Sequence, residues 1–177
     1  MACGDGCAMS CPYPSDVSVL VACFGNVLRG DDGFGYAVAQ RLLAGPLPEG
    51  LTVIEVGIGG IHLVQELMGG VDALIVVDAL DLGRPPGTVI TQVPDVADVS
   101  ALPIEERRDE LADMHYATPE RALMLARGLG VLPATTLVVG VQTTDTERLD
   151  QRLSGATAAA VQTAVDEVRR LAEQLLP

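Results

Sequence analysis

An apolar run that leads into a glycine-rich turn constrains the fold of this chain most strongly. Val17–Phe24 is apolar apart from Ser18, and the segment after it reads Gly25-Asn26-Val27-Leu28-Arg29-Gly30-Asp31-Asp32-Gly33-Phe34-Gly35. A run of this kind is typical of a strand buried on both faces, as in a parallel sheet covered by helices. The sequence therefore predicts a buried strand followed by two adjacent carboxylates. We expect Asp31 or Asp32 to cap the next helix.

Strand-like and helix-like segments alternate along the rest of the chain. Further strands are predicted over Leu51–Val56, Ala73–Val77, Thr88–Val93 and Thr135–Val141. Helices are predicted to follow Gly57–Gly60, Thr118-Pro119 and Ser154. The alternation favours an α/β fold: a single domain with a doubly wound, mostly parallel sheet sandwiched by helices in three layers, α/β/α. Residues 1–16 are expected to form an irregular cysteine-containing arm, and residues 17–177 the domain.

Charge and composition argue against two classes of partner. The 177 residues carry a net charge of −13 and only 3% aromatic residues, so the chain would repel a phosphate backbone and offers few rings for base stacking. No apolar run approaches the roughly 20 residues of a membrane-spanning helix. The N-terminus also lacks the basic patch and apolar core of a signal peptide. We therefore expect no nucleic-acid partner, no membrane association and a cytoplasmic location.

Three of the four cysteines lie in the arm, at a regular spacing. Cys3, Cys7 and Cys11 follow the pattern Cys-x3-Cys-x3-Cys, whereas metal sites more typically use Cys-x2-Cys pairs. Cys23, in the first predicted strand, is expected to be buried. We interpret the arm as carrying incidental thiols, with an iron or zinc site as the alternative.

Three polar residues stand where a parallel sheet would bring them to one edge. These are one of the adjacent aspartates Asp31 and Asp32 after the first strand, Asp78 at the end of the apolar strand Ala73–Val77, and His115 before a predicted helix start. Two carboxylates and an imidazole form a ligand set that suits zinc, nickel or manganese. Each residue also has a plain structural interpretation, as a cap, a loop residue or a surface residue. The other histidine, His62, lies within a predicted helix and is interpreted as a surface or packed residue.

With these residues, the chain resembles the hydrogenase maturation endopeptidases, which trim the C-terminal extension from the large subunit of nickel–iron hydrogenases. The resemblance extends over about Val17 to Val168. Besides the glycine-rich turn, it rests on motifs in the family's order: Val76-Val77-Asp78-Ala79, Pro86-Gly87-Thr88, Asp113-Met114-His115, Val139-Gly140-Val141-Gln142 and Leu153-Ser154. It differs at Ile58, where the family often has a hydroxyl residue, and at Thr143, where a proline often stands.

The resemblance implies an endopeptidase that acts on a nickel-loaded large-subunit precursor, its expected partner. The family's metal-contacting and catalytic residues fall on Asp32, Asp78 and His115, and the nickel is expected to arrive with the precursor. The family is classified as aspartic-type, and the sequence leaves open whether the chemistry is of that type or directed by metal. Two alternatives stay open: a non-catalytic nickel checkpoint or chaperone that binds the large subunit, and an α/β ligand-binding domain.

Overall fold

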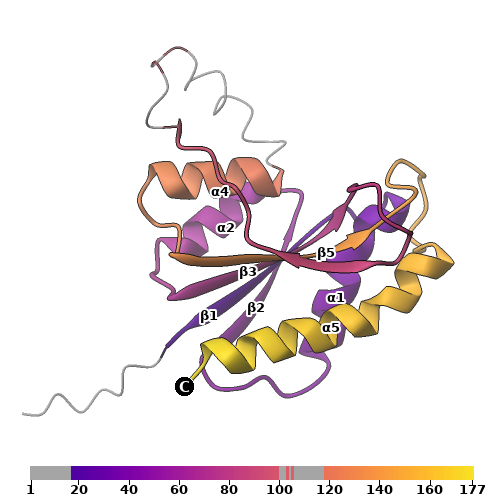
Figure 1. Ribbon diagram of the computed structural model, residues 1–177, viewed down its shortest axis with the longest axis horizontal. Helices are drawn as coiled ribbons and strands as arrows, with labels where there is room; N and C mark the ends of the chain where they lie inside the picture. Colours follow the sequence, from indigo (N-terminus) through magenta and orange to yellow (C-terminus); the bar gives the residue numbers. More distant parts are fainter. Residues whose placement is uncertain (1–16, 100–102, 104, 106–117) are drawn as a thin grey trace, which may run out of the picture.

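The computed structural model describes residues 17–99, 103, 105 and 118–177, and within them the sheet has five strands. These are β1 (Val19–Phe24), β2 (Leu51–Gly57), β3 (Ala73–Leu80), β4 (Val89–Gln92) and β5 (Thr135–Gln142). The strand order is β2-β1-β3-β5-β4, with parallel pairing everywhere except between β5 and the edge strand β4, which is antiparallel (Figure 1). The predicted α/β fold with a mostly parallel sheet is therefore confirmed.

Helices cover both faces of this sheet. The described helical elements are the 3₁₀ turn η1 (Gly30–Gly33) and the helices α1 (Phe34–Leu43), α2 (Gly60–Leu67), α4 (Pro119–Gly128) and α5 (Gly155–Leu175). Helices α1 and α5 pack on one face, and α2 and α4 on the other (Figure 1). The layers are thus the α/β/α arrangement expected from the sequence.

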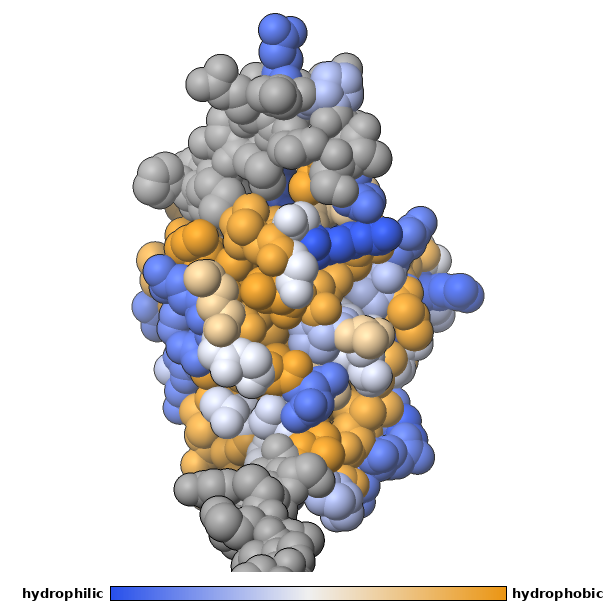
Figure 2. All heavy atoms as spheres, turned by 90° about the vertical axis from the view of Figure 1, so that its left-hand side faces the viewer, coloured by the Kyte–Doolittle hydropathy of each residue, from blue (hydrophilic) through white to orange (hydrophobic). Residues whose placement is uncertain are grey.

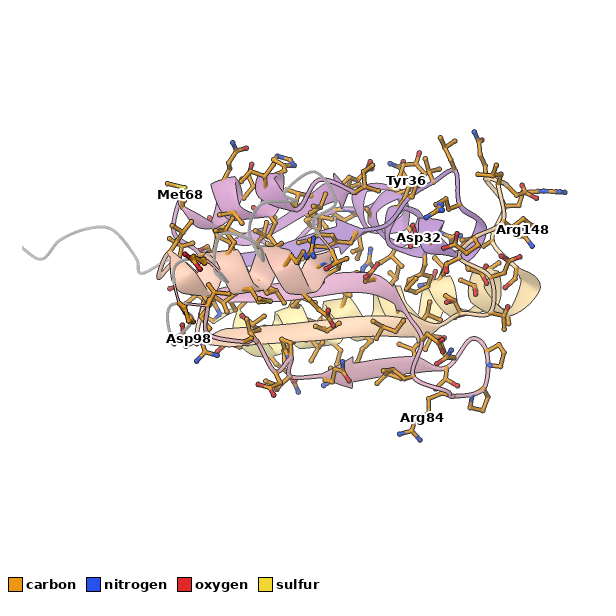
Figure 3. The ribbon with its side chains drawn as sticks, turned by 90° about the horizontal axis from the view of Figure 1, so that it is seen from above. Asp32, Tyr36, Met68, Arg84, Asp98 and Arg148 are labelled. Carbon is orange, nitrogen blue, oxygen red and sulfur yellow. The ribbon has the colours of Figure 1, made fainter. Side chains whose placement is uncertain are left out.

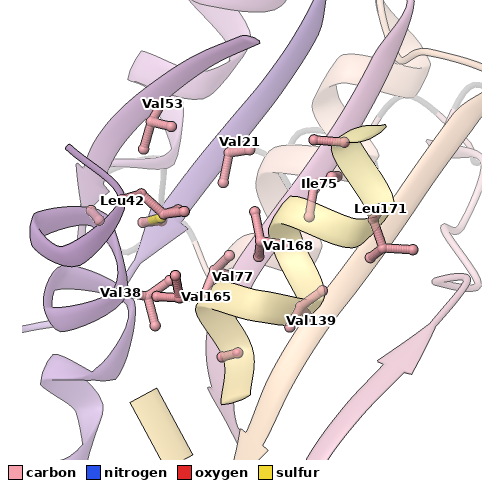
Figure 4. Close-up of a cluster of buried hydrophobic side chains, with 14 of the residues drawn as sticks. Val21, Val38, Leu42, Val53, Ile75, Val77, Val139, Val165, Val168 and Leu171 are labelled. Atoms are coloured by element: carbon pink, nitrogen blue, oxygen red, sulfur yellow. The ribbon is translucent and has the colours of Figure 1, made fainter. Parts of the chain in front are cut away.

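The alternation of side chains along the central strands divides the core in two. In β1, Val19, Val21 and Cys23 face α1 and α5, whereas Leu20, Ala22 and Phe24 face α2 and α4. Figure 4 shows the first of these clusters, in which Val21 and Ile75 of the sheet meet Val168 and Leu171 of α5. Cys23 is 1% exposed and is a free thiol, as expected. Burial on both faces explains the unbroken apolar runs of β1 and β3.

The strand order reverses at β1. From β1 the chain moves outward to β2 and then returns to β3 on the other side of β1. In open α/β sheets the carboxyl ends of the two strands at such a reversal border a crevice in which ligands bind. The fold therefore places the segment after β1 and the end of β3 at the position where a site is expected.

Two details differ from the sequence-based expectations. Strand β3 continues past Asp78 to Leu80, because Asp78, Ala79 and Leu80 pair with the last three residues of β5. The predicted aspartate cap is wrong: neither Asp31 nor Asp32 caps α1, whose N-cap is Gly33 with no side-chain hydrogen bond. Both carboxylates instead accept hydrogen bonds from outside α1, which leaves neither of them as its cap.

The two predicted polar helix starts are confirmed. Thr118 caps α4, with its side chain accepting a hydrogen bond from the N–H of Arg121, and Pro119 opens the helix. Ser154 caps α5 in the same way through Thr157. Because a cap and its helix are neighbours in sequence, local pattern is enough to locate them.

None of the helices in the described residues combines the length and the apolar character needed to cross a membrane. At the end of the molecule that Figure 2 shows, apolar side chains lie among polar ones. This is the Met68 end in Figure 3, opposite the end that carries Asp32.

Candidate active site

A cavity of about 240 Å³ opens at the carboxyl ends of the central strands, at the reversal of strand order. It is lined by residues of the segments that follow β1 and β2, by the end of β3 and by the start of α4: Phe24, Gly25, Asp32, Gly57, Ile58, Asp78, Thr118 and Pro119. Most of this wall is apolar. The structure therefore brings Asp32 and Asp78 together, as predicted from the sequence, in a largely apolar surrounding.

Asp32 is held by the turn that precedes α1. Its Oδ2 atom and its backbone carbonyl both accept from the N–H of Asn26, at 3.0 Å and 3.2 Å. Gly25 allows this approach, because its φ is +128° and a Cβ there would lie 1.9 Å from the carbonyl oxygen of Asp32. Burial raises the pKa of the Asp32 carboxyl, although the Asn26 bond and the charge of Arg29 oppose the shift. Figure 3 shows Asp32 near the Arg148 end of the sheet.

Asp78 reaches the cavity because of its position in the alternation of β3. Side chains alternate between the two faces of the sheet along β3. Leu74 and Val76 face α2 and α4, so Asp78, two residues after Val76, lies on the same face and points toward the start of α4. Burial raises the pKa of Asp78 to about 7; a backbone hydrogen bond at Ala79 opposes the shift and the negative charge of Asp32 adds to it. The two carboxylates therefore interact electrostatically across the cavity, and Asp78 holds a proton at a higher pH than an exposed aspartate.

The neighbouring aspartate, Asp31, has a different environment. It is fully buried and accepts from Ser154 twice, from the backbone N–H at 2.6 Å and from the hydroxyl at 2.8 Å. Burial alone would raise the pKa of Asp31, but the hydrogen bonds from Ser154 and Thr157 outweigh it and the pKa is lowered. Asp31 is absent from the cavity lining. Sequence reasoning missed this role because Ser154 lies 123 residues further along the chain.

Gln142, at the end of β5, is a second residue whose role the sequence did not reveal. Its buried side chain accepts from the backbone N–H groups of Leu82 and Arg84 and donates to the Asp81 carboxylate and to the carbonyl of Thr143. Every polar atom of the amide is therefore bonded. The only available signal was the motif Val139–Gln142, which marked the residue without giving its contacts.

Of the two histidines and the three arm cysteines that the sequence singled out, the structure describes only His62. His62 lies exposed on α2, with Nε2 3.4 Å from Glu66 Oε1, as its surface interpretation predicts. His115 and the arm cysteines Cys3, Cys7 and Cys11 lie outside the described residues. Within residues 17–99, 103, 105 and 118–177, no three His, Cys, Asp or Glu side chains form a group that could hold a metal ion. The described part of the predicted ligand set is the pair Asp32 and Asp78.

Comparison with known proteins identifies the family. The sequence model of the hydrogenase maturation protease family matches residues 37–171, which is most of the chain. The chain belongs to this family. The matched range includes Asp78 and begins after Asp32. Membership confirms the resemblance drawn from the motifs, and with it a peptidase that acts in hydrogenase maturation.

Individual family members agree with this assignment. The chain is 31% identical to the hydrogenase 2 maturation peptidase of a Thaumarchaeota archaeon, over 87% of this chain and 97% of that one, with a TM-score of 0.62. It is also 31% identical to the hydrogenase expression/formation protein HupD of Rhodobacter capsulatus, over 86% of this chain and 70% of HupD. The maturating endopeptidase HybD of E. coli, at 21% identity, shares the fold with a TM-score of 0.69, over 89% of this chain and 93% of HybD.

Proposed function

We propose that the protein removes the C-terminal extension of a nickel-loaded nickel–iron hydrogenase large-subunit precursor, in the cytoplasm. Two findings support this. The chain belongs to the hydrogenase maturation protease family, and its relatives are named a hydrogenase expression/formation protein and a hydrogenase 2 maturation peptidase. The observation that carries the proposal is the placement of Asp32 and Asp78 in one cavity at the reversal of strand order.

In this proposal Asp32, Asp78 and His115 contact the nickel that the precursor brings. Carboxylate and imidazole ligands suit a divalent transition metal. Asp32 and Asp78 supply the carboxylates from the cavity wall. His115 belongs to the set through the family resemblance; it stands three residues before Thr118, which lines the cavity, and three residues span at most about 11 Å.

The chemistry is the hydrolysis of one peptide bond. Water adds its oxygen to the scissile carbonyl carbon, the C–N bond breaks, and the departing amine takes up a proton. The nickel of the precursor directs the scissile bond to the cavity, and a carboxylate oxygen of Asp32 or Asp78 that does not contact the nickel accepts the proton from water and returns it to the amine. The apolar wall formed by Phe24, Ile58 and Pro119 limits water around these groups and strengthens their electrostatic effect.

The test is a cleavage assay on purified precursor with and without nickel. We expect release of the C-terminal peptide, followed by mass spectrometry, only from the nickel-loaded precursor. Asp32→Ala, Asp78→Ala and His115→Ala should each abolish release, while His62→Ala and Asp95→Asn, at exposed positions, should leave it unchanged. Circular dichroism of each variant verifies that the domain is folded.

The alternatives give different results in the same assay. A non-catalytic checkpoint would bind the nickel-loaded precursor without releasing peptide, and a general ligand-binding domain would not distinguish the two precursors. Cleavage of both precursors at the same rate would favour aspartic-type chemistry without metal. Wild-type rates in the Asp32 and Asp78 variants would refute the proposed site.

A further inference from the structure

Adjacent residues Asp31 and Asp32 lie in opposite surroundings. Asp32 is half-buried and lines the cavity, whereas the side chain of Asp31 is enclosed on the other side of the same turn. A fully buried carboxylate is costly unless hydrogen bonds compensate for the lost water. The proposed chemistry does not use Asp31, so its burial must be explained by a role other than catalysis.

The bonds of Asp31 join the turn to the start of α5. Ser154 donates its backbone N–H to Oδ1 and its hydroxyl to Oδ2, and the same hydroxyl accepts from the N–H of Thr157 inside the helix. A negative charge is also favoured at the N-terminus of a helix, and α5 is 21 residues long. The longest described helix therefore anchors the residue next to Asp32.

Backbone bonds complete the attachment of the turn. The N–H of Gly30 donates to the carbonyl of Asp150 at 2.7 Å, and the N–H of Asp31 donates to the carbonyl of Asp145 at 3.0 Å. On the cavity side, Asn26 donates to the backbone and side chain of Asp32. The position of the Asp32 carboxylate is thus set from one side by the loop before α5 and from the other by the loop after β1.

We propose that Asp31 is a positioning residue: its buried bonds to Ser154 fix the turn that presents Asp32 to the cavity. This inference rests on the proposed role of Asp32. A displacement of about 1 Å in a reacting group can cost about 100-fold in rate, so an anchor of this kind acts on turnover. Because the anchor lies outside the cavity, it makes no contact with the precursor there.

The chain contains a control with the same bonding pattern at an exposed position. Asp72 also accepts from the backbone N–H and the hydroxyl of one serine, Ser18, at 2.8 Å and 3.1 Å. Ser18 precedes β1 and Asp72 precedes β3, so this pair stands at the amino ends of the strands, far from the cavity. Asp72→Ala removes the same type of bonds without touching the Asp32 turn.

The experiment compares Asp31→Ala, Ser154→Ala and Asp72→Ala in the full chain. We expect the first two to lower kcat for cleavage of the nickel-loaded precursor about 10- to 100-fold, with KM changed less than about twofold. Amide hydrogen exchange at Asn26, measured without precursor, should accelerate in the same two variants. Asp31→Asn, which keeps an acceptor oxygen for Ser154, should restore most of kcat. Asp72→Ala should change neither readout.

Each outcome supports or overturns the anchor. Where Asp31→Ala does not fold, Ser154→Ala and Asp31→Asn provide the test. Wild-type kcat and wild-type exchange at Asn26 in the folded Asp31 and Ser154 variants would overturn it. An equal loss of kcat in Asp72→Ala would overturn it as well, since the effect would then not depend on the turn that carries Asp32. If Asp32→Ala cleaves at the wild-type rate, the proposed site fails instead, and exchange at Asn26 alone decides whether Asp31 anchors the turn.

Discussion

The Oε1 atom of Gln142 accepts a hydrogen bond from the backbone N–H of Leu82 at 2.7 Å, so a side chain from the end of β5 fixes the loop that follows β3. The same oxygen accepts from the N–H of Arg84 at 3.1 Å. The loop begins at Asp81, three residues after the cavity-lining Asp78, at the end of a strand that pairs with β5 throughout its length. Gln142 thereby extends the β3–β5 pairing beyond the last ladder bonds.

Replacing Gln142 by alanine should destabilise the domain. The substitution removes the acceptor of two backbone N–H groups, on the exposed residues Leu82 and Arg84; a net hydrogen bond contributes about 0.5–1.5 kcal/mol, so we expect a loss of about 1–3 kcal/mol. Urea unfolding followed by circular dichroism measures it. Gln162→Ala, on the exposed side of α5, is the control and should cost less than about 0.5 kcal/mol. A similar loss in both variants would contradict the role of the Gln142 bonds.

Asp78 should make stability depend on pH between about 4 and 7. Burial raises the pKa of Asp78 from its ordinary value of 3.8 to about 7, so between these values the folded protein binds a proton that the unfolded chain releases. The contribution of this proton is complete below pH 3.8 and is lost as the pH rises through 7. Relative to Asp78→Asn, the wild type should therefore lose about 2–4 kcal/mol of stability over this range.

Urea unfolding of wild type, Asp78→Asn and the exposed control Asp95→Asn at several pH values tests this, without precursor or added metal. The difference between wild type and Asp95→Asn should stay nearly constant. If the difference in unfolding free energy between wild type and Asp78→Asn also stays constant with pH, the pKa of Asp78 is not raised in the folded protein.

Glu167 should have the opposite dependence on pH. Hydrogen bonds from the Arg170 guanidinium lower the pKa of Glu167 to about 2 against the opposing effect of burial, and the hydroxyl of Thr91 adds a third bond, at 2.7 Å. This contribution is present above the ordinary pKa of 4.5 and is lost as the pH falls through about 2. Because Arg170 is half exposed, we expect only about 1 kcal/mol at pH 7.

The comparison of wild type with Glu167→Gln at pH 7 and pH 2.5 measures this contribution, with Glu173→Gln on the same helix as the control. The loss of unfolding free energy in Glu167→Gln relative to wild type should be smaller at pH 2.5 than at pH 7, whereas Glu173→Gln should have nearly the wild-type stability at both pH values. A deficit that grows in acid would contradict the assignment.

Gly25→Ala should disturb the turn that carries Asp32. A Cβ at this position would lie 1.9 Å from the carbonyl oxygen of Asp32 and the φ of +128° disfavours alanine, so either the turn moves or the domain loses about 3 kcal/mol or more. Gly70→Ala is the control, since its φ is also positive, at +81°, but nothing lies within 4 Å of the added Cβ. That variant should lose about 1 kcal/mol. Equal losses would show that close approach to Asp32 contributes nothing.

Sequence alone predicted the sheet because the physical signals are local. A strand buried on both faces needs an unbroken apolar run, and Val19–Phe24 and Ala73–Val77 provide it. Thr118 and Ser154 identified their helices because a cap bonds to a residue three positions away. The position of Asp78 followed from the same reasoning, since the carboxyl ends of parallel strands share one edge of a sheet.

The family resemblance pointed to Asp32, but only the tertiary structure shows why Asp32 faces the cavity and the adjacent Asp31 does not. Asp31 and Asp32 have the same side chain and the same local surroundings in the sequence. In the fold, Ser154 donates its hydrogen bonds to Asp31, and Asp32 lines the cavity. Gln142 likewise bonds to residues of a distant segment, the loop after β3. Strand β3 extends beyond its apolar run because its last three residues pair with β5. Hydrogen bonds between distant segments depend on packing, which no local pattern encodes. Apolar periodicity determined the framework of this protein, and long-range bonds determined which groups meet in its cavity.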